Sequence, residues 1–273
     1  MQAVPEIGKS IRVGGVLTNY HEAGKGIPVI LIHGSGPGVS AWANWSRAIP
    51  SISEHFHVYA YDQLGFGYTE LPRENRYGLE QWTEHLIGFM RAVGVSRAHL
   101  VGNSMGAAVA LAAAVKHPEV VDHLVLMGAM GVRFPLTESI DAVWGYTPSI
   151  PNRRRLLDIF AYNRELVTDE LAELRYKASI RPGMQEAFSS MFPAPRQHGV
   201  DALSVYEDRL GEIRAPALVI HGRDDRVIPL STSEKLLHIL DTVQLHVFGR
   251  CGHWTQIEHA AAFNRLVRDF LLE

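Results

Sequence analysis

The segment Gly102-Asn103-Ser104-Met105-Gly106 constrains the fold of this chain more than any other, because it places one serine between two glycines where a strand is expected to meet a helix. Residues 97–101 end in an apolar alternation typical of a buried strand, and residues 107–117 have the alanine and leucine content of a buried helix. A turn that joins them directly must be very tight. The two glycines have no Cβ atoms to collide there, so Ser104 can hold a strained backbone with its hydroxyl exposed above the sheet.

Two later segments supply the groups that would activate a serine nucleophile. An apolar strand near residues 217–220 leads into a turn that carries Asp224 and Asp225, and a glycine loop near the C-terminus carries His253. The chain order Ser, Asp, His is one in which catalytic triads occur. We predict Asp225 as the carboxylate, because Gly-x-x-Asp before an apolar residue and proline is the usual turn for it. Asp224 is the alternative; otherwise it caps the turn.

The third element is an apolar strand at residues 27–32 followed by His33-Gly34-Ser35-Gly36-Pro37-Gly38. Attack on a carbonyl places negative charge on its oxygen, and two backbone N–H groups can stabilise that charge. We predict the amides of Ser35 and Met105 for this oxyanion hole, with His33 holding the loop. A dinucleotide-binding loop is the rival interpretation, but Val39 stands where its third glycine belongs and Pro37 lacks an amide.

Composition excludes several classes of function. The net charge of -3 and the pI near 6.5 leave no basic excess for a nucleic-acid backbone, so we expect no such partner. Cys251 is the single cysteine, which excludes an internal disulfide and a cysteine-rich zinc site. Neither a metal nor another cofactor is expected, because Thr255 and Gln256 interrupt the spacing a zinc motif around His253 would need. Without a secretory signal or a membrane span, the chain is expected in the cytoplasm.

Strand and helix signals alternate along most of the chain, which predicts an α/β fold with a mainly parallel sheet and helices on both faces. The strand signals are at residues 29–32, 58–61, 99–101, 124–127, 218–220 and 245–248, after an antiparallel start at residues 11–21. The strand rhythm stops after Gly131, where short amphipathic helices are expected at residues 156–160, 169–178 and 185–192. We therefore predict a core of residues 1–133 and 205–273 with a helical lid of residues 134–204.

The combined motifs resemble those of the meta-cleavage product hydrolases, carbon-carbon bond hydrolases with the α/β-hydrolase fold. The resemblance rests on the glycine loop at residues 33–38, Trp42-Ala43-Asn44, the segment around Ser104, Arg181-Pro182, and Cys251-Gly252-His253-Trp254 with Glu258-His259. It covers nearly the whole chain and is greatest for the 2-hydroxymuconate-semialdehyde hydrolases. One departure is Ala107, where the family often has a further glycine.

The resemblance implies a substrate of the 2-hydroxy-6-oxohexa-2,4-dienoate type, a small dienoate that is cleaved to 2-hydroxypenta-2,4-dienoate and a small carboxylic acid. It implies that Arg181 pairs with the substrate carboxylate and that Asn44, Asn103 and Trp254 bind the oxygenated end. A homo-oligomer is also implied. Bulky residues of the lid favour a small substituent on the cleaved carbonyl; they are Phe134, Ile140, Trp144 and Phe192.

Two alternative functions remain open from the sequence. A carboxylesterase could use the same triad, and it would hydrolyse a p-nitrophenyl ester while ignoring the yellow ring-fission product. A non-catalytic binding protein with this fold would not react with a fluorophosphonate.

Overall fold

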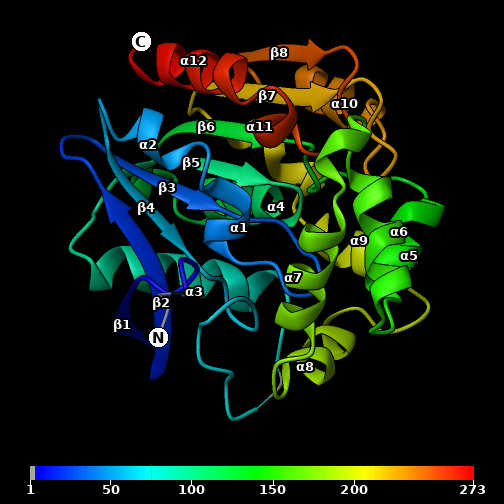
Figure 1. Ribbon diagram of the computed structural model, residues 1–273. Coiled ribbons are helices and arrows are strands. Elements are labelled where there is room, and N and C mark those ends of the chain that lie inside the picture. Colours follow the sequence, from blue (N-terminus) through cyan, green and yellow to red (C-terminus); the bar gives the residue numbers. More distant parts are fainter. Residues whose placement is uncertain (1–3, 75) are drawn as a thin grey trace.

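The computed structural model describes residues 4–74 and 76–273 (Figure 1). Within these residues one eight-stranded sheet runs in the order β1-β2-β4-β3-β5-β6-β7-β8. The strands are β1 (Lys9–Val13), β2 (Val16–Ala23), β3 (Pro28–Ile32), β4 (His57–Tyr61), β5 (Ala98–Asn103), β6 (Val121–Met127), β7 (Ala217–Gly222) and β8 (Val243–Phe248). β2 pairs antiparallel with both β1 and β4, and the remaining neighbours, from β4 and β3 through β5 to β8, pair parallel. The α/β fold and the antiparallel start that the sequence predicts are confirmed.

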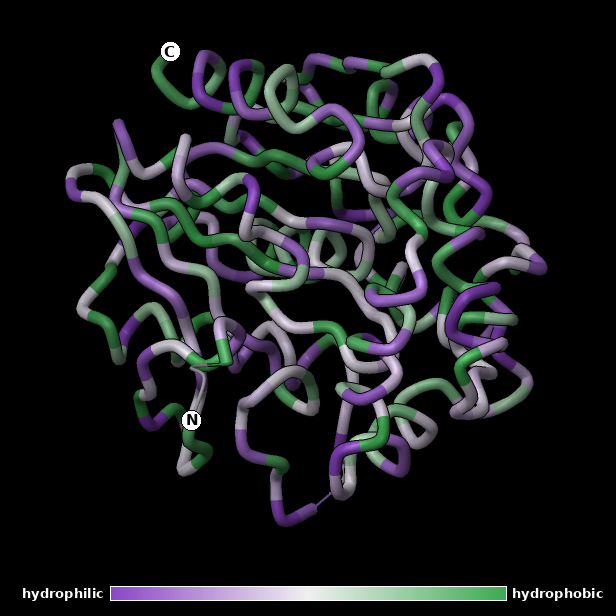
Figure 2. Tube along the Cα trace, viewed as in Figure 1, coloured by the Kyte–Doolittle hydropathy of each residue, from purple (hydrophilic) through white to green (hydrophobic). Residues whose placement is uncertain are grey.

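Helices cover both faces of the sheet. The core helices are α1 (Ala41–Trp45), α2 (Ile49–Ile52), α3 (Leu79–Ala92), α4 (Met105–Lys116), α10 (Ser231–Ile239), α11 (Thr255–Glu258) and α12 (Ala260–Leu271). Successive side chains of β3 point to opposite faces: Ile30 and Ile32 pack in one apolar cluster with α3 and α4, whereas Val29 and Leu31 pack in another with α1, α2 and α12. Because both faces of the central strands are buried, β3 to β7 are largely apolar, which Figure 2 shows along the centre of the molecule.

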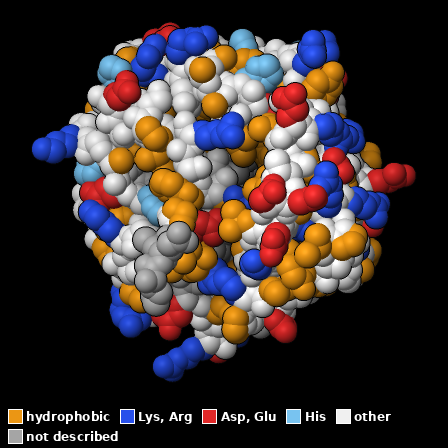
Figure 3. All heavy atoms as spheres, in the orientation of Figure 1, with side chains coloured by type: hydrophobic (Ala, Val, Ile, Leu, Met, Phe, Trp, Pro, Cys, Tyr) orange, Lys and Arg blue, Asp and Glu red, His pale blue; other side chains and the backbone are white. Residues whose placement is uncertain are grey.

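Five α-helices lie between β6 and β7, on the right of Figure 1. They are α5 (Glu138–Trp144), α6 (Ile150–Phe160), α7 (Asp169–Ser179), α8 (Met184–Met191) and α9 (Gln197–Leu203). All fall within residues 134–204, the segment we predict to be the lid. Acidic and basic side chains are interspersed over this part of the surface (Figure 3). That the segment behaves as a separate lid stays a prediction.

The helix predictions for this segment were right in part. Thr168 caps α7 by accepting a hydrogen bond from the amide of Leu171, as expected, and Pro182 lies between α7 and α8. The sequence analysis missed α5, α9 and the first half of α6. Their start signals are present, because Thr137 and Ser149 cap α5 and α6 with their hydroxyls.

No helix in the described part of the chain combines the length and the apolar character needed to cross a bilayer.

Candidate active site

Ser104 lies between β5 and α4 with a backbone conformation that non-glycine residues rarely adopt, φ 56° and ψ -118°. The flanking glycines make the turn possible. A Cβ at position 102 would lie 2.5 Å from the Gly106 carbonyl oxygen, and one at position 106 would lie 2.3 Å from the Ile32 carbonyl oxygen. The glycines therefore let the helix start against β3 and β5, and the strained turn lifts Ser104 to the carboxyl edge of the sheet.

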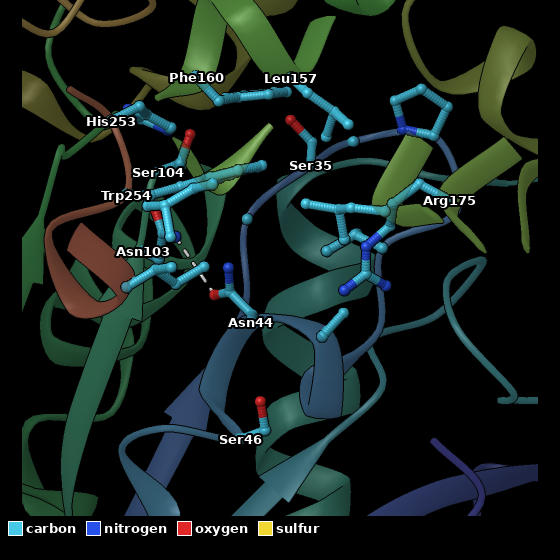
Figure 4. Close-up of a pocket in the computed structure, with 18 of the residues that line it drawn as sticks. Ser35, Asn44, Ser46, Asn103, Ser104, Leu157, Phe160, Arg175, His253 and Trp254 are labelled. Atoms are coloured by element: carbon cyan, nitrogen blue, oxygen red, sulfur yellow. Dashed lines mark hydrogen bonds between the residues drawn. The ribbon is translucent and has the colours of Figure 1, made fainter. Parts of the chain in front are cut away.

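His253 and Asp225 meet at the same edge, although 28 positions separate them in the chain. Nδ1 of His253 lies 2.7 Å from Oδ2 of Asp225, and the two side chains are 3% and 1% exposed. Figure 4 shows the Ser104 hydroxyl directed toward the His253 ring. This places the serine, the imidazole and the carboxylate in the order that transfers a proton from serine to histidine.

Asp225 is held as an ionised acceptor. Its Oδ1 accepts hydrogen bonds from the amides of Val227 at 2.7 Å and Ile228 at 3.0 Å. Burial alone would raise the pKa of this carboxyl group, but the charge and hydrogen bond of His253, with His221 and the Ile228 amide, lower it below its ordinary value. Asp224 is 31% exposed and lies against the Cys251 amide at 3.4 Å instead. The geometry therefore favours Asp225 over Asp224.

The glycine loop beside Ser104 is held by His33. Its Nδ1 lies 2.7 Å from the Gly34 carbonyl oxygen, and its Nε2 accepts a hydrogen bond from the amide of Gln63 at 3.0 Å. This pairing defines a neutral ring, and burial lowers the pKa of His33 to about 4. The expectation that His33 supports the loop is confirmed. Ser35 lines the cavity within this loop, and Met105 is the first residue of α4, where helix amides have no intrahelical partner.

A cavity of about 220 Å³ lies over Ser104, between the core and the helices α6 and α7. Asn44, Asn103 and Trp254 line it, as the resemblance implies (Figure 4). Nδ2 of Asn103 donates to Oδ1 of Asn44 at 3.2 Å, and Trp254 stacks on Phe160 with their ring centroids 5.2 Å apart. The sequence-predicted residues therefore form one polar wall and one aromatic wall.

Arg181 is the predicted substrate-binding residue that the structure does not bring to this cavity. Its Nη1 donates to the Gly67 carbonyl oxygen at 2.8 Å, and its guanidinium lies 3.8 Å from the centre of the Tyr68 ring. Arg153 and Arg175, from the lid helices α6 and α7, line the cavity instead. Neither arginine was predicted from the sequence. Arg153 lies on the same apolar stripe of α6 as Leu156, Leu157 and Phe160, and an arginine within such a stripe could have indicated a buried functional cation.

The two lid arginines have different partners. Arg175 forms an ion pair with Glu6 at 2.7 Å. Arg153 is 3% exposed, and its Nε and Nη2 have no hydrogen-bond partner among the described residues. Burial lowers the pKa of Arg153 to about 10, so its guanidinium is still charged at pH 7.

The bulky lid residues pack against one another. Trp144 stacks on Phe192 with centroids 4.2 Å apart, and its Nε1 donates to the Ser35 hydroxyl at 3.1 Å. Neither they nor Phe134 and Ile140 are among the described residues that line the cavity.

The strained serine, its histidine and their buried carboxylate give this sheet the geometry of serine hydrolases built on the α/β-hydrolase fold. The sequence model of the alpha/beta hydrolase fold family matches residues 27–260.

Comparison with named relatives identifies the family within the α/β-hydrolase fold to which the chain belongs. A 2-hydroxy-6-oxo-2,4-heptadienoate hydrolase of Pseudomonas putida F1 is 58% identical over 97% of this chain and 96% of its own. A 2-hydroxymuconate semialdehyde hydrolase of Pseudomonas sp. CF600 is 56% identical over 100% of this chain and 96% of its own. The solved meta-cleavage product hydrolase of Pseudomonas fluorescens IP01, a serine-to-alanine variant complexed with acetates, has a TM-score of 0.96 at 58% identity, covering 97% and 98% of the two chains. The chain therefore belongs to the meta-cleavage product hydrolases, as the resemblance implied.

Proposed function

We propose that the protein hydrolyses the carbon-carbon bond between C5 and C6 of 2-hydroxy-6-oxohexa-2,4-dienoates with a hydrogen or a short alkyl group on C6. One observation carries the proposal. The described residues that line the cavity over Ser104 include no aspartate or glutamate but two largely buried arginines, Arg153 and Arg175, besides the exposed Arg47. A general esterase for neutral esters has no need of buried cations, whereas a dienoate brings a carboxylate that must be matched inside the pocket.

Arg153 and Arg175 are proposed to bind that carboxylate. Glu6 neutralises one of the two guanidinium charges, so the pair retains a net charge of about one, which matches a single carboxylate. The free nitrogens of Arg153 can donate to the substrate without breaking a contact within the protein. Arg181 is not assigned this role, because its guanidinium is engaged by Gly67 and Tyr68.

The polar wall is proposed to orient the enol end of the substrate. Oδ1 of Asn103 is buried and has no partner among the described residues, so it can accept a hydrogen bond from the 2-hydroxyl group. Asn44 fixes the amide of Asn103 from behind, and Trp254 covers the planar diene.

The reaction is proposed to begin with a proton shift. The proton of the 2-hydroxyl group leaves and C5 gains one, which converts the dienol into a 2-oxo compound with a CH₂ group beside the C6 carbonyl. This shift matters because the electron pair of the C5–C6 bond can afterwards leave into a conjugated 2-oxo system. His253 then takes the proton of Ser104, and the serine oxygen attacks C6. The amides of Ser35 and Met105 are proposed to stabilise the resulting oxyanion.

Collapse of the tetrahedral intermediate breaks the C5–C6 bond. The electron pair moves into the 2-oxo system, the resulting dienolate takes the proton that His253 holds and leaves as 2-hydroxypenta-2,4-dienoate, and the acyl group remains on Ser104. Water, deprotonated by His253, hydrolyses this ester to a small carboxylic acid and regenerates the hydroxyl group.

A comparison of two substrates tests the proposal. Purified protein should remove the yellow colour of the heptadienoate substrate with a kcat/KM at least about 100-fold above that for p-nitrophenyl acetate, a preference equal to about 2.7 kcal/mol. The kcat/KM values of dienoates with hydrogen, methyl or phenyl on C6 would show which acyl group the enzyme prefers. Faster hydrolysis of the ester than of every dienoate would contradict the proposed reaction and support the esterase alternative.

Three further properties are proposed. The enzyme acts as a homo-oligomer in the cytoplasm, and residues 134–204 form a lid that controls entry to the cavity. The family resemblance supports the oligomer, and the single, buried Cys251 is compatible with a reducing compartment. Light scattering of the purified protein would test the oligomer: a monomeric mass at micromolar concentration contradicts it.

A further inference from the structure

A cluster of three metal-ligating side chains lies at the end of the sheet opposite Ser104. His99 is the second residue of β5, and Asp122 and His123 are the second and third residues of β6. At a rise of about 3.3 Å per residue, the five residues from His99 to Ser104 span about 16 Å. The cluster is therefore separate from the catalytic cavity, and the proposed hydrolysis uses none of its members.

An irregularity in strand pairing brings the three side chains together. β5 and β6 pair Ala98 with Val121 and Leu100 with Leu124, and the register shifts between these pairs. One residue of β5, His99, therefore faces two residues of β6. In a regular strand two adjacent side chains point to opposite faces, but an extra residue re-aims one of them. This allows Asp122 and His123 both to approach His99.

The distances suit a small metal ion. Oδ2 of Asp122 lies 3.5 Å from Nδ1 of His99 and 3.7 Å from Nδ1 of His123. One ligand atom from each of the three residues lies within 4.8 Å of the others. Ligands bonded to zinc at about 2.0–2.1 Å are about 3.3 Å apart at the corners of a tetrahedron. Small side-chain rotations would therefore bring all three atoms into coordination distance.

The histidine nitrogens have no competing partners. His99 is 1% exposed, and both of its ring nitrogens, with Nδ1 of His123, lack a hydrogen-bond partner among the residues the structure describes. Buried polar atoms without a partner are destabilising, so the bare cluster is a costly way to pack two imidazoles.

The surroundings complete the requirements of a metal site. Nη2 of Arg97 lies 2.7 Å from the second carboxylate oxygen of Asp122, which orients the carboxylate while leaving Oδ2 free for an ion. The Phe56 and Phe270 rings pack edge-on against His99 and His123. Asp122 and His123 also line a surface hollow of about 240 Å³, which offers an ion a path from solvent.

We propose that His99, Asp122 and His123 bind one divalent ion of the zinc class, such as Zn²⁺ or Co²⁺, and that this ion stabilises the fold. Two imidazole nitrogens and one carboxylate oxygen are a donor set that these ions accept, and three protein ligands leave a fourth position for water. By tying β5 to β6, the ion would favour the folded chain over the unfolded one.

Tag-free protein, treated with EDTA and dialysed, is titrated with Co²⁺ and separately with Zn²⁺. We expect visible absorption bands of four-coordinate Co²⁺ that saturate at one equivalent, and a rise of about 5 °C in the midpoint of thermal unfolding at saturating Zn²⁺. Turnover of the heptadienoate should be unchanged. Absence of the bands together with an unchanged midpoint would overturn the proposal.

Variants distinguish this site from the other histidines of the chain. His123→Asn, whose side chain is 17% exposed, and Asp122→Asn should abolish both the bands and the shift, as should His99→Asn if it folds. His238→Asn removes an exposed histidine of α10 and should bind one equivalent as tightly as the native protein. Arg97→Gln removes the ion pair that orients Asp122 but no ligand, so it should still bind one equivalent, about 10-fold more weakly. Unchanged binding by His123→Asn and Asp122→Asn would also overturn the proposal.

Discussion

Replacing Asp225 with asparagine tests the buried imidazole–carboxylate pair with almost no change in shape. In the native protein Oδ1 accepts two backbone amides and Oδ2 lies 2.7 Å from Nδ1 of His253. In Asp225→Asn the amide oxygen must stay on the amides of Val227 and Ile228, so the NH₂ group faces the histidine. A donor at that position favours the tautomer with its proton on Nε2, which cannot accept the proton of Ser104.

The expected loss is large because the pair is shielded from water. Asp225 is 1% exposed and stabilises the positive charge that develops on His253 during attack. Loss of the correct tautomer and of that charge lowers kcat on the order of 10⁴-fold in a serine triad, which corresponds to about 5.5 kcal/mol of transition-state stabilisation. KM should change little, because Asp225 lies behind His253 and is not among the described residues lining the cavity.

The assay is the loss of the yellow colour of the heptadienoate in stopped-flow mixing, with thermal unfolding measured in parallel. Asp224→Asn is the matched control: this neighbouring carboxylate is 31% exposed and touches the Cys251 amide, so kcat should stay within about threefold of the native value. A kcat of Asp225→Asn at or above one tenth of the native value would show that Asp225 does not orient His253. So would a kcat of Asp224→Asn as low as that of Asp225→Asn.

Three further predictions concern the arginines proposed to bind the substrate carboxylate, the tight turn at Ser104, and the loss of folding stability at acid pH. Arg153→Met should lower kcat/KM for the dienoate about 10- to 100-fold, through a higher KM, without lowering the melting temperature. Arg181→Met should keep kcat/KM within about threefold of the native value. Equal effects of the two substitutions would contradict the assignment of Arg153. Gly106→Ala should lower the free energy of unfolding in urea by more than about 3 kcal/mol, because its Cβ would lie 2.3 Å from the Ile32 carbonyl oxygen. Gly36→Ala should not, because its Cβ would come no closer than 4.0 Å to Val39. Because burial lowers the pKa of His33 to about 4, the folded state binds fewer protons than the unfolded state between about pH 4 and 6.5. Stability is therefore lost as the pH falls through that range, and His33→Gln should reduce the loss between pH 6.5 and 5 by about 2 kcal/mol; an unchanged loss would show that His33 is not the group responsible.

The meeting of Ser104, Asp225 and His253 at one edge of the sheet could be predicted from sequence, because each residue follows a strand and has its own local signature. Ser104 has its glycines, Asp225 its turn and His253 its glycine loop, and parallel strands bring their carboxyl ends to one edge of the sheet. Only the parallel order of the strands, which the apolar runs indicate, had to be known for this prediction. Side-chain packing did not.

The arginines that line the cavity could not be predicted in this way. Arg181 follows α7 and precedes a proline, which makes it conspicuous in the sequence, but which arginine faces the cavity depends on how α6 and α7 pack over the core. The pairing irregularity that joins His99 to Asp122 and His123 is likewise a property of strand register, which an apolar alternation does not reveal.

A single-turnover experiment with Ser104→Ala and the heptadienoate tests whether the Ser104 oxygen attacks the C6 carbonyl. We expect the variant to bind the substrate and to shift its absorbance as the dienol is consumed, but to release acetate at least about 10³-fold more slowly than the native enzyme. Release of acetate at a near-native rate would show that Ser104 is not the nucleophile.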